Sequence, residues 1–178
     1  MSEFVKRPIK KSKSPLIDDE CIKYLNYRIQ QEELSSRIYL SMSMYLNNEG
    51  YTGAATLWKK YSEEELIHAD WSRDYLLAMG VTPETPALAV QPSTYTGLPE
   101  IIKMSYDHEI EVTKQIKEMA SHFLKKGDHM AYELCLRYLK EQVEEMEKVT
   151  NLMDILFTFG ESKEQLFMLD NKLENLAK

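Results

Sequence analysis

The chain has 178 residues, of which 43% are hydrophobic and 29% are charged, and its formal net charge is −7. This length and composition fit one soluble domain with a hydrophobic core, and no apolar run reaches the roughly 20 residues that cross a bilayer. The basic N-terminus lacks the apolar segment of a secretory signal, so the sequence favours a cytoplasmic protein. Cys21 and Cys135 stand far apart in helical context, as small buried residues do in a reducing compartment.

The charge is unevenly distributed along the chain. The first 13 residues contain five basic side chains and one acidic one, so the remainder is more acidic than the total. An acidic body argues against nucleic acid as a partner of the fold and is compatible with attracting cations. We therefore expect residues 1–15 to be a disordered basic tail and residues 16–178 to form one domain.

The first two helices are predicted from hydrophobic periodicity and its interruptions. One spans about 18–48 and ends at the turn sequence NNEGYTG, which contains two glycines and two asparagines. The next spans about 52–79, with Thr52 as a predicted N-cap and Gly80 just beyond its end.

The remaining helices follow a proline-rich connector at 80–97, which has no helical period. A third helix is predicted from about 99 to 127 and a fourth from about 128 to 159, with a proline at the start of the third and a glycine after the end of the fourth. Ser162 and Gln165 have the spacing of a capping box, which predicts a short fifth helix to about residue 176.

The lengths of these segments predict an architecture. Four helices of roughly 30 residues are each about 45 Å long at 1.5 Å per residue. Short turns join the first to the second and the third to the fourth, so each pair forms an antiparallel hairpin. The connector could extend to about 60 Å, enough to run the length of the hairpins. The sequence predicts an all-α four-helix bundle with one long crossover and a short fifth C-terminal helix.

Each long helix carries polar residues inside its apolar stripe. These are Glu32 on the first, Glu65 and His68 on the second, Glu109 on the third, and Gln142 and Glu145 on the fourth. A buried carboxylate without compensation is very costly, so it must be protonated, ion-paired or bound to metal. We expect no basic residue on these stripes, because Arg28 and Arg37, the nearest, could both reach solvent. Metal binding is then the simplest neutralisation.

The donor types indicate which metals would fit. Glu65 and His68 are three residues apart, so both can ligate one ion. Mostly oxygen donors with one nitrogen suit Fe²⁺, Fe³⁺, Mn²⁺ and, less selectively, Zn²⁺, and four carboxylates supply charge for two divalent ions. Taken singly, each residue has an ordinary interpretation: a chance Glu-x-x-His, a solvent-facing Glu109, a core Tyr39. The coincidence of six polar positions with four stripes favours a metal centre.

The chain resembles the bacterial non-haem ferritins over residues 17–178. The resemblance rests on the motifs EELSSRIYL, EEELIH, YDHE and EQVEE, and on the closing segment LFMLDNKLENL. It implies a ferroxidase centre within each subunit, in which Glu32, Glu65 and His68 hold one iron. Glu65 would bridge to a second iron held by Glu109 and Glu145.

The resemblance also implies roles around this pair of irons. Gln142 would line the site, and Tyr39 would donate an electron or a hydrogen bond during O₂ chemistry. A third, weaker iron site would use four acids: Glu64, Glu141, Glu144 and Glu145. The family assembles 24 subunits into a hollow shell that stores ferric mineral, so a homo-oligomer of this size is expected.

Differences between this sequence and related di-iron families narrow the expected type of iron centre. Bacterioferritins, rubrerythrins and many di-iron oxidases carry a second Glu-x-x-His on the fourth helix, where this chain has Gln142-Val-Glu-Glu145. A site with one nitrogen would hold its second iron more loosely, which suits release of oxidised iron toward a store. Leu66 stands where bacterioferritins use a methionine for haem, so no haem is expected. No Cys-x-x-Cys pair exists for a rubredoxin-type iron.

The leading hypothesis is iron storage with oxidation of Fe²⁺ by O₂ or H₂O₂. A DNA-protecting mini-ferritin that uses the basic tail is an alternative, although those proteins place their site between subunits. A structural subunit with an inactive centre would lack a ligand, and none is missing. A di-iron oxidase without storage stays open. We expect the other histidines, His108, His122 and His129, at the surface.

Overall fold

The computed structural model describes residues 13–177, so most of the predicted basic tail lies outside the described residues. Five helices follow one another in this part of the chain: α1 (Asp19–Asn48), α2 (Thr52–Ala78), α3 (Leu98–Lys126), α4 (His129–Phe159) and α5 (Lys163–Leu176). The prediction of four long helices and a short fifth one is confirmed, with boundaries that differ by one or two residues.

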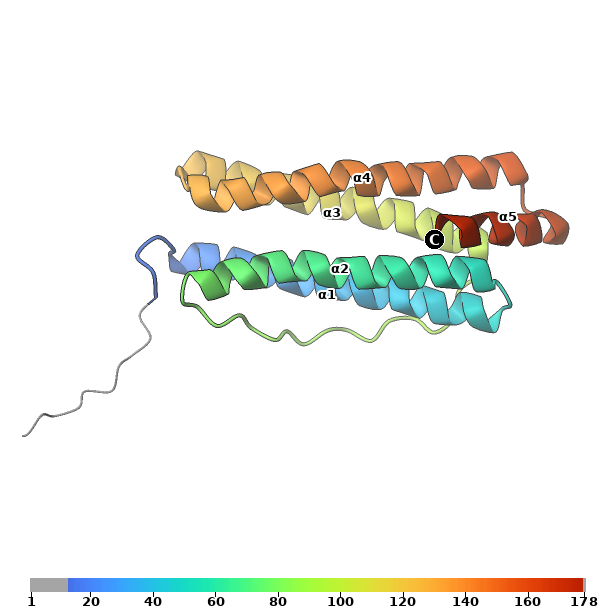
Figure 1. Cartoon of the computed structure of the whole chain (residues 1–178), viewed down its shortest axis with the longest axis horizontal. Helices are drawn as coiled ribbons and strands as arrows, with labels where there is room; N and C mark the ends of the chain where they lie inside the picture. Colours follow the sequence, from blue (N-terminus) through green and yellow to red (C-terminus); the bar gives the residue numbers. More distant parts are fainter. Residues whose placement is uncertain (1–12, 178) are drawn as a thin grey trace, which may run out of the picture.

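The helices pack as two antiparallel hairpins, α1 with α2 and α3 with α4 (Figure 1). The connector between the hairpins runs the length of the bundle as an extended strap along α1 (Figure 1). Hydrogen bonds tie it there: Asn26 accepts from the backbone N–H of Glu84 at 3.0 Å, and Gln30 donates to the carbonyl of Ala87 at 3.3 Å. The predicted long crossover is confirmed, and it places α3 next to α1.

Side-chain caps fix three helix starts. Asp18 accepts from the N–H of Cys21 at 2.8 Å before α1, and Asp128 accepts from the N–H of Ala131 at 3.0 Å before α4. Before α5, Ser162 and Gln165 form the predicted capping box. Such caps satisfy backbone donors that would otherwise lack partners at a helix N-terminus.

The start of α2 differs from the prediction. Thr52 is the first helical residue, and the cap position belongs to Tyr51, whose side chain makes no capping hydrogen bond. Asp170 of α5 caps this end from a distance, accepting from the N–H of Ala54 at 2.7 Å and of Gly53 at 3.3 Å. A Cβ on Gly53 would lie 2.3 Å from the backbone oxygen of Asp170, so only glycine permits this close approach. The C-terminal helix therefore helps to hold α2 in place.

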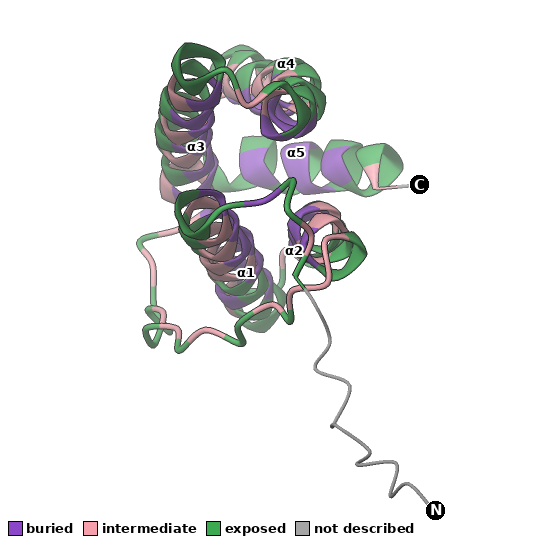
Figure 2. Ribbon diagram, turned by 90° about the vertical axis from the view of Figure 1, so that its left-hand side faces the viewer, coloured by how far each residue is buried: buried purple, intermediate pink, exposed green. Residues whose placement is uncertain are grey.

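The apolar interior consists of two clusters, one toward each end of the bundle. The cluster near α5 includes Leu46, Trp58, Ile102, Leu152 and Leu169, and the opposite cluster includes Cys21, Leu25, Leu76, Phe123 and Cys135. Side chains of this size each contribute about 1.5–3 kcal/mol when fully buried. Both cysteines are buried free thiols. The polar residues predicted as ligands lie on the helical turns between the two clusters, and Figure 2 shows the buried faces of the four helices turned toward this interior.

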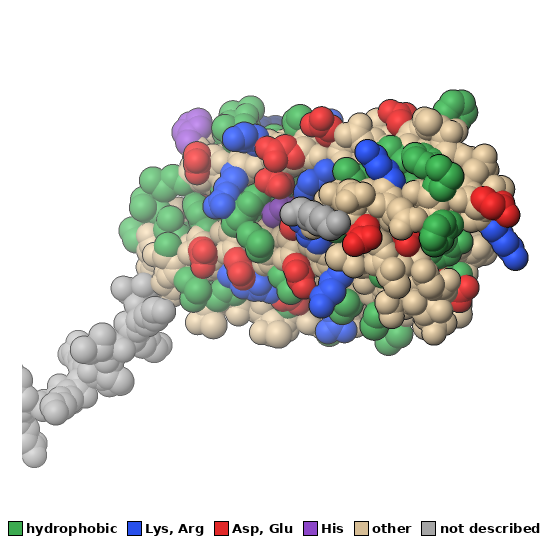
Figure 3. Space-filling view, turned by 45° about the vertical axis from the view of Figure 1, so that its right-hand side comes forward, with side chains coloured by type: hydrophobic (Ala, Val, Ile, Leu, Met, Phe, Trp, Pro, Cys, Tyr) green, Lys and Arg blue, Asp and Glu red, His purple; other side chains and the backbone are tan. Residues whose placement is uncertain are grey.

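The outer surface is charged and mixed. Acidic and basic side chains are interspersed on the face shown in Figure 3. None of the described helices combines the length and the apolar character that a membrane span requires.

Candidate metal centre

Four helices contribute six polar side chains to the middle of the bundle. They are Glu32 of α1 (1% exposed), Glu65 and His68 of α2 (5% and 6%), Glu109 of α3 (1%), and Gln142 and Glu145 of α4 (both 6%). Each helix was predicted to turn these residues inward because they share a stripe with buried apolar neighbours. Their burial is confirmed for all six.

One compact ligand group lies between α1 and α2. Glu32, Glu65 and His68 each offer one ligand atom, and these atoms lie within 4.8 Å of one another. The Nδ1 atom of His68 is 3.2 Å from Oε2 of Glu65, one helical turn away. A hydrogen bond from α4 fixes the backbone at this point, because the Tyr138 hydroxyl donates to the carbonyl of His68 at 2.7 Å. The structure therefore brings together the three residues predicted for the first iron.

A second group joins α2 to α4. Ligand atoms of His68, Glu141 and Glu145 also lie within 4.8 Å of one another, with Nε2 of His68 3.5 Å from Oε1 of Glu141. The predicted second set was instead Glu65, Glu109 and Glu145. Among the described residues, Glu109 belongs to neither compact group, so its role as a ligand stays a prediction.

Glu109 is held by hydrogen bonds on both carboxylate oxygens. The Tyr39 hydroxyl donates to Oε1, and the amide of Gln142 donates to Oε2 at 3.0 Å. The same amide donates to Oγ1 of Thr113 at 3.0 Å, a contact that sequence reasoning did not anticipate. Burial, and then the charge of Glu109, raise the pKa of Tyr39 well above its ordinary value, so this phenol keeps its proton at neutral pH. Tyr39 and Gln142 thus orient Glu109 toward the centre.

Burial and mutual repulsion oppose ionisation of the central carboxylates. Burial, followed by the neighbouring Glu32 and Glu109, raises the pKa of Glu65 well above its ordinary value. Burial also raises the pKa of Glu145 to about 7, against the opposing effect of Lys148. A divalent cation among these groups would remove the repulsion and favour the ionised forms. The donor set, four carboxylates and an imidazole, fits iron.

Two basic side chains of the described residues reach the centre, contrary to the expectation that its stripes carry none. Arg28, expected to reach solvent, is 1% exposed, and its Nε lies 2.7 Å from Oε1 of Glu32. That expectation was wrong because Arg28 lies one turn before Glu32 on the same buried face. Arg37 is exposed, as expected. Lys148 contacts Glu145 at 2.9 Å from the next turn of α4. The i,i+4 spacing of Arg28 and Glu32 and the i,i+3 spacing of Glu145 and Lys148 could have predicted these two ion pairs from the sequence.

The acids predicted for a third iron are more peripheral. Glu64 and Glu141 are half-buried, and Glu144 is exposed. Oε2 of Glu64 lies 2.9 Å from the ammonium of Lys148. Partial burial lowers the pKa of this ammonium, but its contacts with Glu145 and Glu64 outweigh that effect and raise it above its ordinary value.

The histidines outside the centre do not all lie at the surface. His129 is exposed as expected, and His122 is half-buried with its ring centroid 4.4 Å from that of Tyr24. His108 is also half-buried: its Nε2 is 2.8 Å from Oγ of Ser35, and burial lowers its pKa. The surface expectation was wrong for His108 and His122 because their partners, Ser35 and Tyr24, lie on another helix, which sequence periodicity does not reveal.

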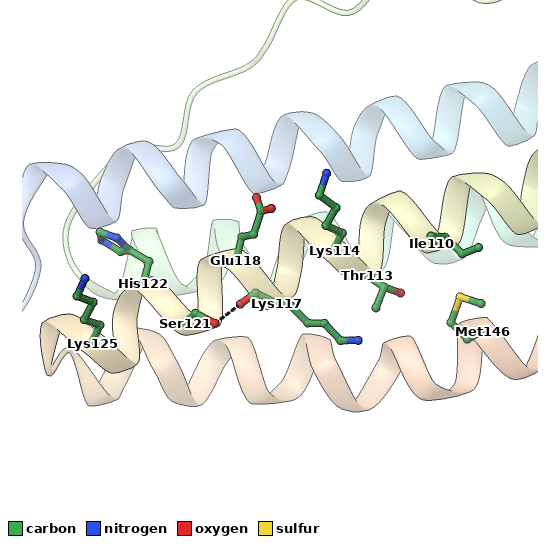
Figure 4. Close-up of a pocket in the computed structure, with 9 residues that line it drawn as sticks. All are labelled: Ile110, Thr113, Lys114, Lys117, Glu118, Ser121, His122, Lys125 and Met146. Carbon is green, nitrogen blue, oxygen red and sulfur yellow. Dashed lines mark hydrogen bonds between the residues drawn. The ribbon is translucent and has the colours of Figure 1, made fainter.

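A hollow of about 810 Å³ runs along α3 and reaches Met146 of α4 (Figure 4). Its lining includes Lys114, Lys117 and Lys125 and none of the predicted site residues. Three ammonium groups disfavour a cation, so this hollow does not compete with the buried centre as an iron site.

Fold and site together define a four-helix bundle with a carboxylate-rich candidate metal centre inside a single chain. The chain belongs to the ferritin-like domain family, whose sequence model matches residues 22–156. It is 29% identical over 162 residues to a probable bacterial non-heme ferritin-like protein of Haemophilus influenzae, covering 91% of this chain and 98% of that protein. It is also 29% identical to a bacterial non-heme ferritin of Escherichia coli O6:H1, with coverage of 90% and 98%.

Solved structures give the same result. An open pore ferritin from the archaeon Archaeoglobus fulgidus superposes with a TM-score of 0.85 at 30% identity, covering 89% of this chain and 97% of that one. The resemblance inferred from the sequence motifs and the predicted bundle are both confirmed.

Proposed function

We propose that this protein oxidises Fe²⁺ with O₂ or H₂O₂ at a two-iron centre within each chain and stores the ferric product in a hollow shell of 24 copies. The observation that carries the proposal is the convergence of Glu32, Glu65 and His68 to within 4.8 Å inside the bundle. The names of the similar proteins, a probable bacterial non-heme ferritin-like protein and a bacterial non-heme ferritin, support the same function. A cytoplasmic location is part of the proposal.

In this proposal iron is the substrate, and the side chains hold it and balance its charge. Glu32, Glu65 and His68 hold the first Fe²⁺, and Glu65 extends to the second, which Glu109 and Glu145 complete. Each Fe²⁺ gives up one electron, and O₂ takes both electrons and two protons to become H₂O₂. The buried carboxylates favour Fe³⁺ over Fe²⁺ because the interaction with negative charge grows with the charge of the ion.

Tyr39 and Gln142 act on Glu109. Their hydrogen bonds fix both carboxylate oxygens, so the group is positioned before iron arrives. The phenol has a single proton, which it gives to Glu109 in the iron-free protein, so Tyr39 would donate a hydrogen bond to a reduced oxygen species only after releasing Glu109. Because α4 supplies Gln142 and not a second histidine, the second iron has no nitrogen ligand there, which favours release of the ferric product.

The test is light scattering coupled to size exclusion after aerobic loading with Fe²⁺. A shell of 24 chains of 20.9 kDa has a mass of about half a megadalton, as a closed homo-oligomer. Storage predicts a particle of this size that retains many more than two irons per chain. A monomer or dimer that retains only two irons per chain would contradict storage and favour an oxidase.

A further inference from the structure

Lys148 lies where the third iron of the centre was predicted. Its Nζ atom is 2.9 Å from Oε2 of Glu64 and 2.9 Å from Oε1 of Glu145, so one ammonium bridges acids from α2 and α4. These are two of the four acids predicted for that iron. The other two are engaged elsewhere or peripheral: Glu141 faces His68 at 3.5 Å, and Glu144 is exposed.

This ion pair differs from an ordinary surface salt bridge. The Glu145 side chain is only 8% exposed, and those of Glu64 and Lys148 are 28% and 31% exposed. The ammonium also lies 5.7 Å from the centroid of the Tyr61 ring, a distance at which a cation is attracted to an aromatic face. Charge-assisted hydrogen bonds to two carboxylates together with an aromatic face define one position for Nζ.

Lys148 stands between the centre and an outer hollow. With Tyr61 and Glu64 it lines a cavity of about 450 Å³ enclosed by α2, α4 and α5. Lys60 lines the same cavity but, among the described residues, forms no ion pair with the acids of the centre. Only one of these two lysines therefore competes directly with a metal ion for carboxylate oxygens.

We propose that Lys148 is a tethered cation that takes the place of a third metal ion, so that the centre binds two irons tightly and a third only when the ammonium is displaced. The proposal rests on the proposed two-iron function and adds a residue that sets how many ions the centre holds. A third ion bound by both Glu64 and Glu145 would have to break both of the 2.9 Å contacts of Nζ. The first iron, at Glu32, Glu65 and His68, would break neither, and the second shares Glu145 with Nζ but leaves the contact with Glu64 in place.

The test is an anaerobic titration of the intact protein with Fe²⁺, in which calorimetry measures the heat of binding. We expect the parent to bind two ions tightly and a third at least tenfold more weakly. In Lys148→Met the third ion should bind at least tenfold more tightly than in the parent, which corresponds to about 1.4 kcal/mol. Lys148→Arg, which keeps the charge, should restore the weak third site.

Lys60→Met is the matched control, since it removes the same charge from the same cavity without a contact to Glu64 or Glu145. Equal affinity for the third ion in Lys148→Met and Lys60→Met would overturn the role of Lys148. If the parent does not bind two Fe²⁺ ions tightly, the proposed function is contradicted. In that case, an ion bound by Lys148→Met and not by the parent would still support the role of Lys148 as a tethered cation. Equal binding of Fe²⁺ by the two proteins would refute that role.

Discussion

Glu145→Gln is expected to stabilise the protein that has been stripped of metal, increasingly so as the pH rises from about 4.5 to about 7. Burial raises the pKa of Glu145 in the folded state to about 7, compared with 4.5 for an unperturbed glutamate. The folded state therefore binds this proton more tightly than the unfolded state does. The stability that results is fully present below about pH 4.5 and is lost as the pH rises to about 7.

The size of the effect follows from this difference. The pKa of Glu145 in the folded state lies two to three pH units above that of an unperturbed glutamate, and each unit corresponds to about 1.4 kcal/mol. Ionised Glu145 therefore lowers the free energy of unfolding by about 3 kcal/mol at pH 8. Glutamine has nearly the same shape and carries no charge at any pH. Relative to the parent, the free energy of unfolding of Glu145→Gln should rise by about 2.5 kcal/mol between pH 5 and pH 8, because part of the cost is already present at pH 5.

Denaturant unfolding of chelator-treated protein, followed by circular dichroism at one fixed protein concentration, measures this difference. Glu144→Gln is the matched control, because Glu144 is exposed on the adjacent position of α4. Its effect should stay within about 0.5 kcal/mol at both pH values. If Glu145→Gln shows the same difference from the parent at pH 5 and pH 8, the ion pair with Lys148 fully offsets burial and the reasoning fails.

Four further substitutions test other contacts. Glu65→Ala should abolish rapid oxidation at two Fe²⁺ per chain in stopped-flow absorbance, and an unchanged rate would refute the bridging role. Tyr39→Phe should lower the free energy of unfolding by about 1–3 kcal/mol, because buried Glu109 loses a donor; a loss below 0.5 kcal/mol would argue against that contact. Arg28→Met should cost about 3–5 kcal/mol in the stripped protein, since Glu32 loses its buried partner, and added Zn²⁺ should restore part of it. Gly53→Ala should cost at least about 1 kcal/mol in thermal unfolding, because a Cβ meets the backbone of Asp170, and an unchanged midpoint would contradict this packing.

The sequence predicts the helices well because their ends carry local signals. Asp18, Asp128 and Ser162 cap the helices they precede, and Gly80 takes the left-handed conformation, with φ of 75°, just after α2. The start of α2 was less predictable, since its donors are satisfied by Asp170 from the far end of the chain. A capping residue that is brought in by tertiary packing has no local pattern.

The acids of the centre were predictable because burial and helical period act together. A carboxylate on the apolar stripe of a helix, such as Glu32, must lie inside the bundle, whichever group neutralises its charge. The basic residues were harder to predict, because a long side chain such as Arg28 or Lys148 can extend from the edge of a stripe to solvent or fold inward. Only the packing of the neighbouring helices decides between these orientations.

Anomalous diffraction at the iron edge, from crystals soaked with Fe²⁺ under argon, would locate the bound iron directly. We predict two iron peaks per chain, one bound by Glu32, Glu65 and His68 and the other between Glu65, Glu109 and Glu145. Absence of iron within bonding distance of Glu65, or a single ion per chain at saturating Fe²⁺, would contradict this prediction.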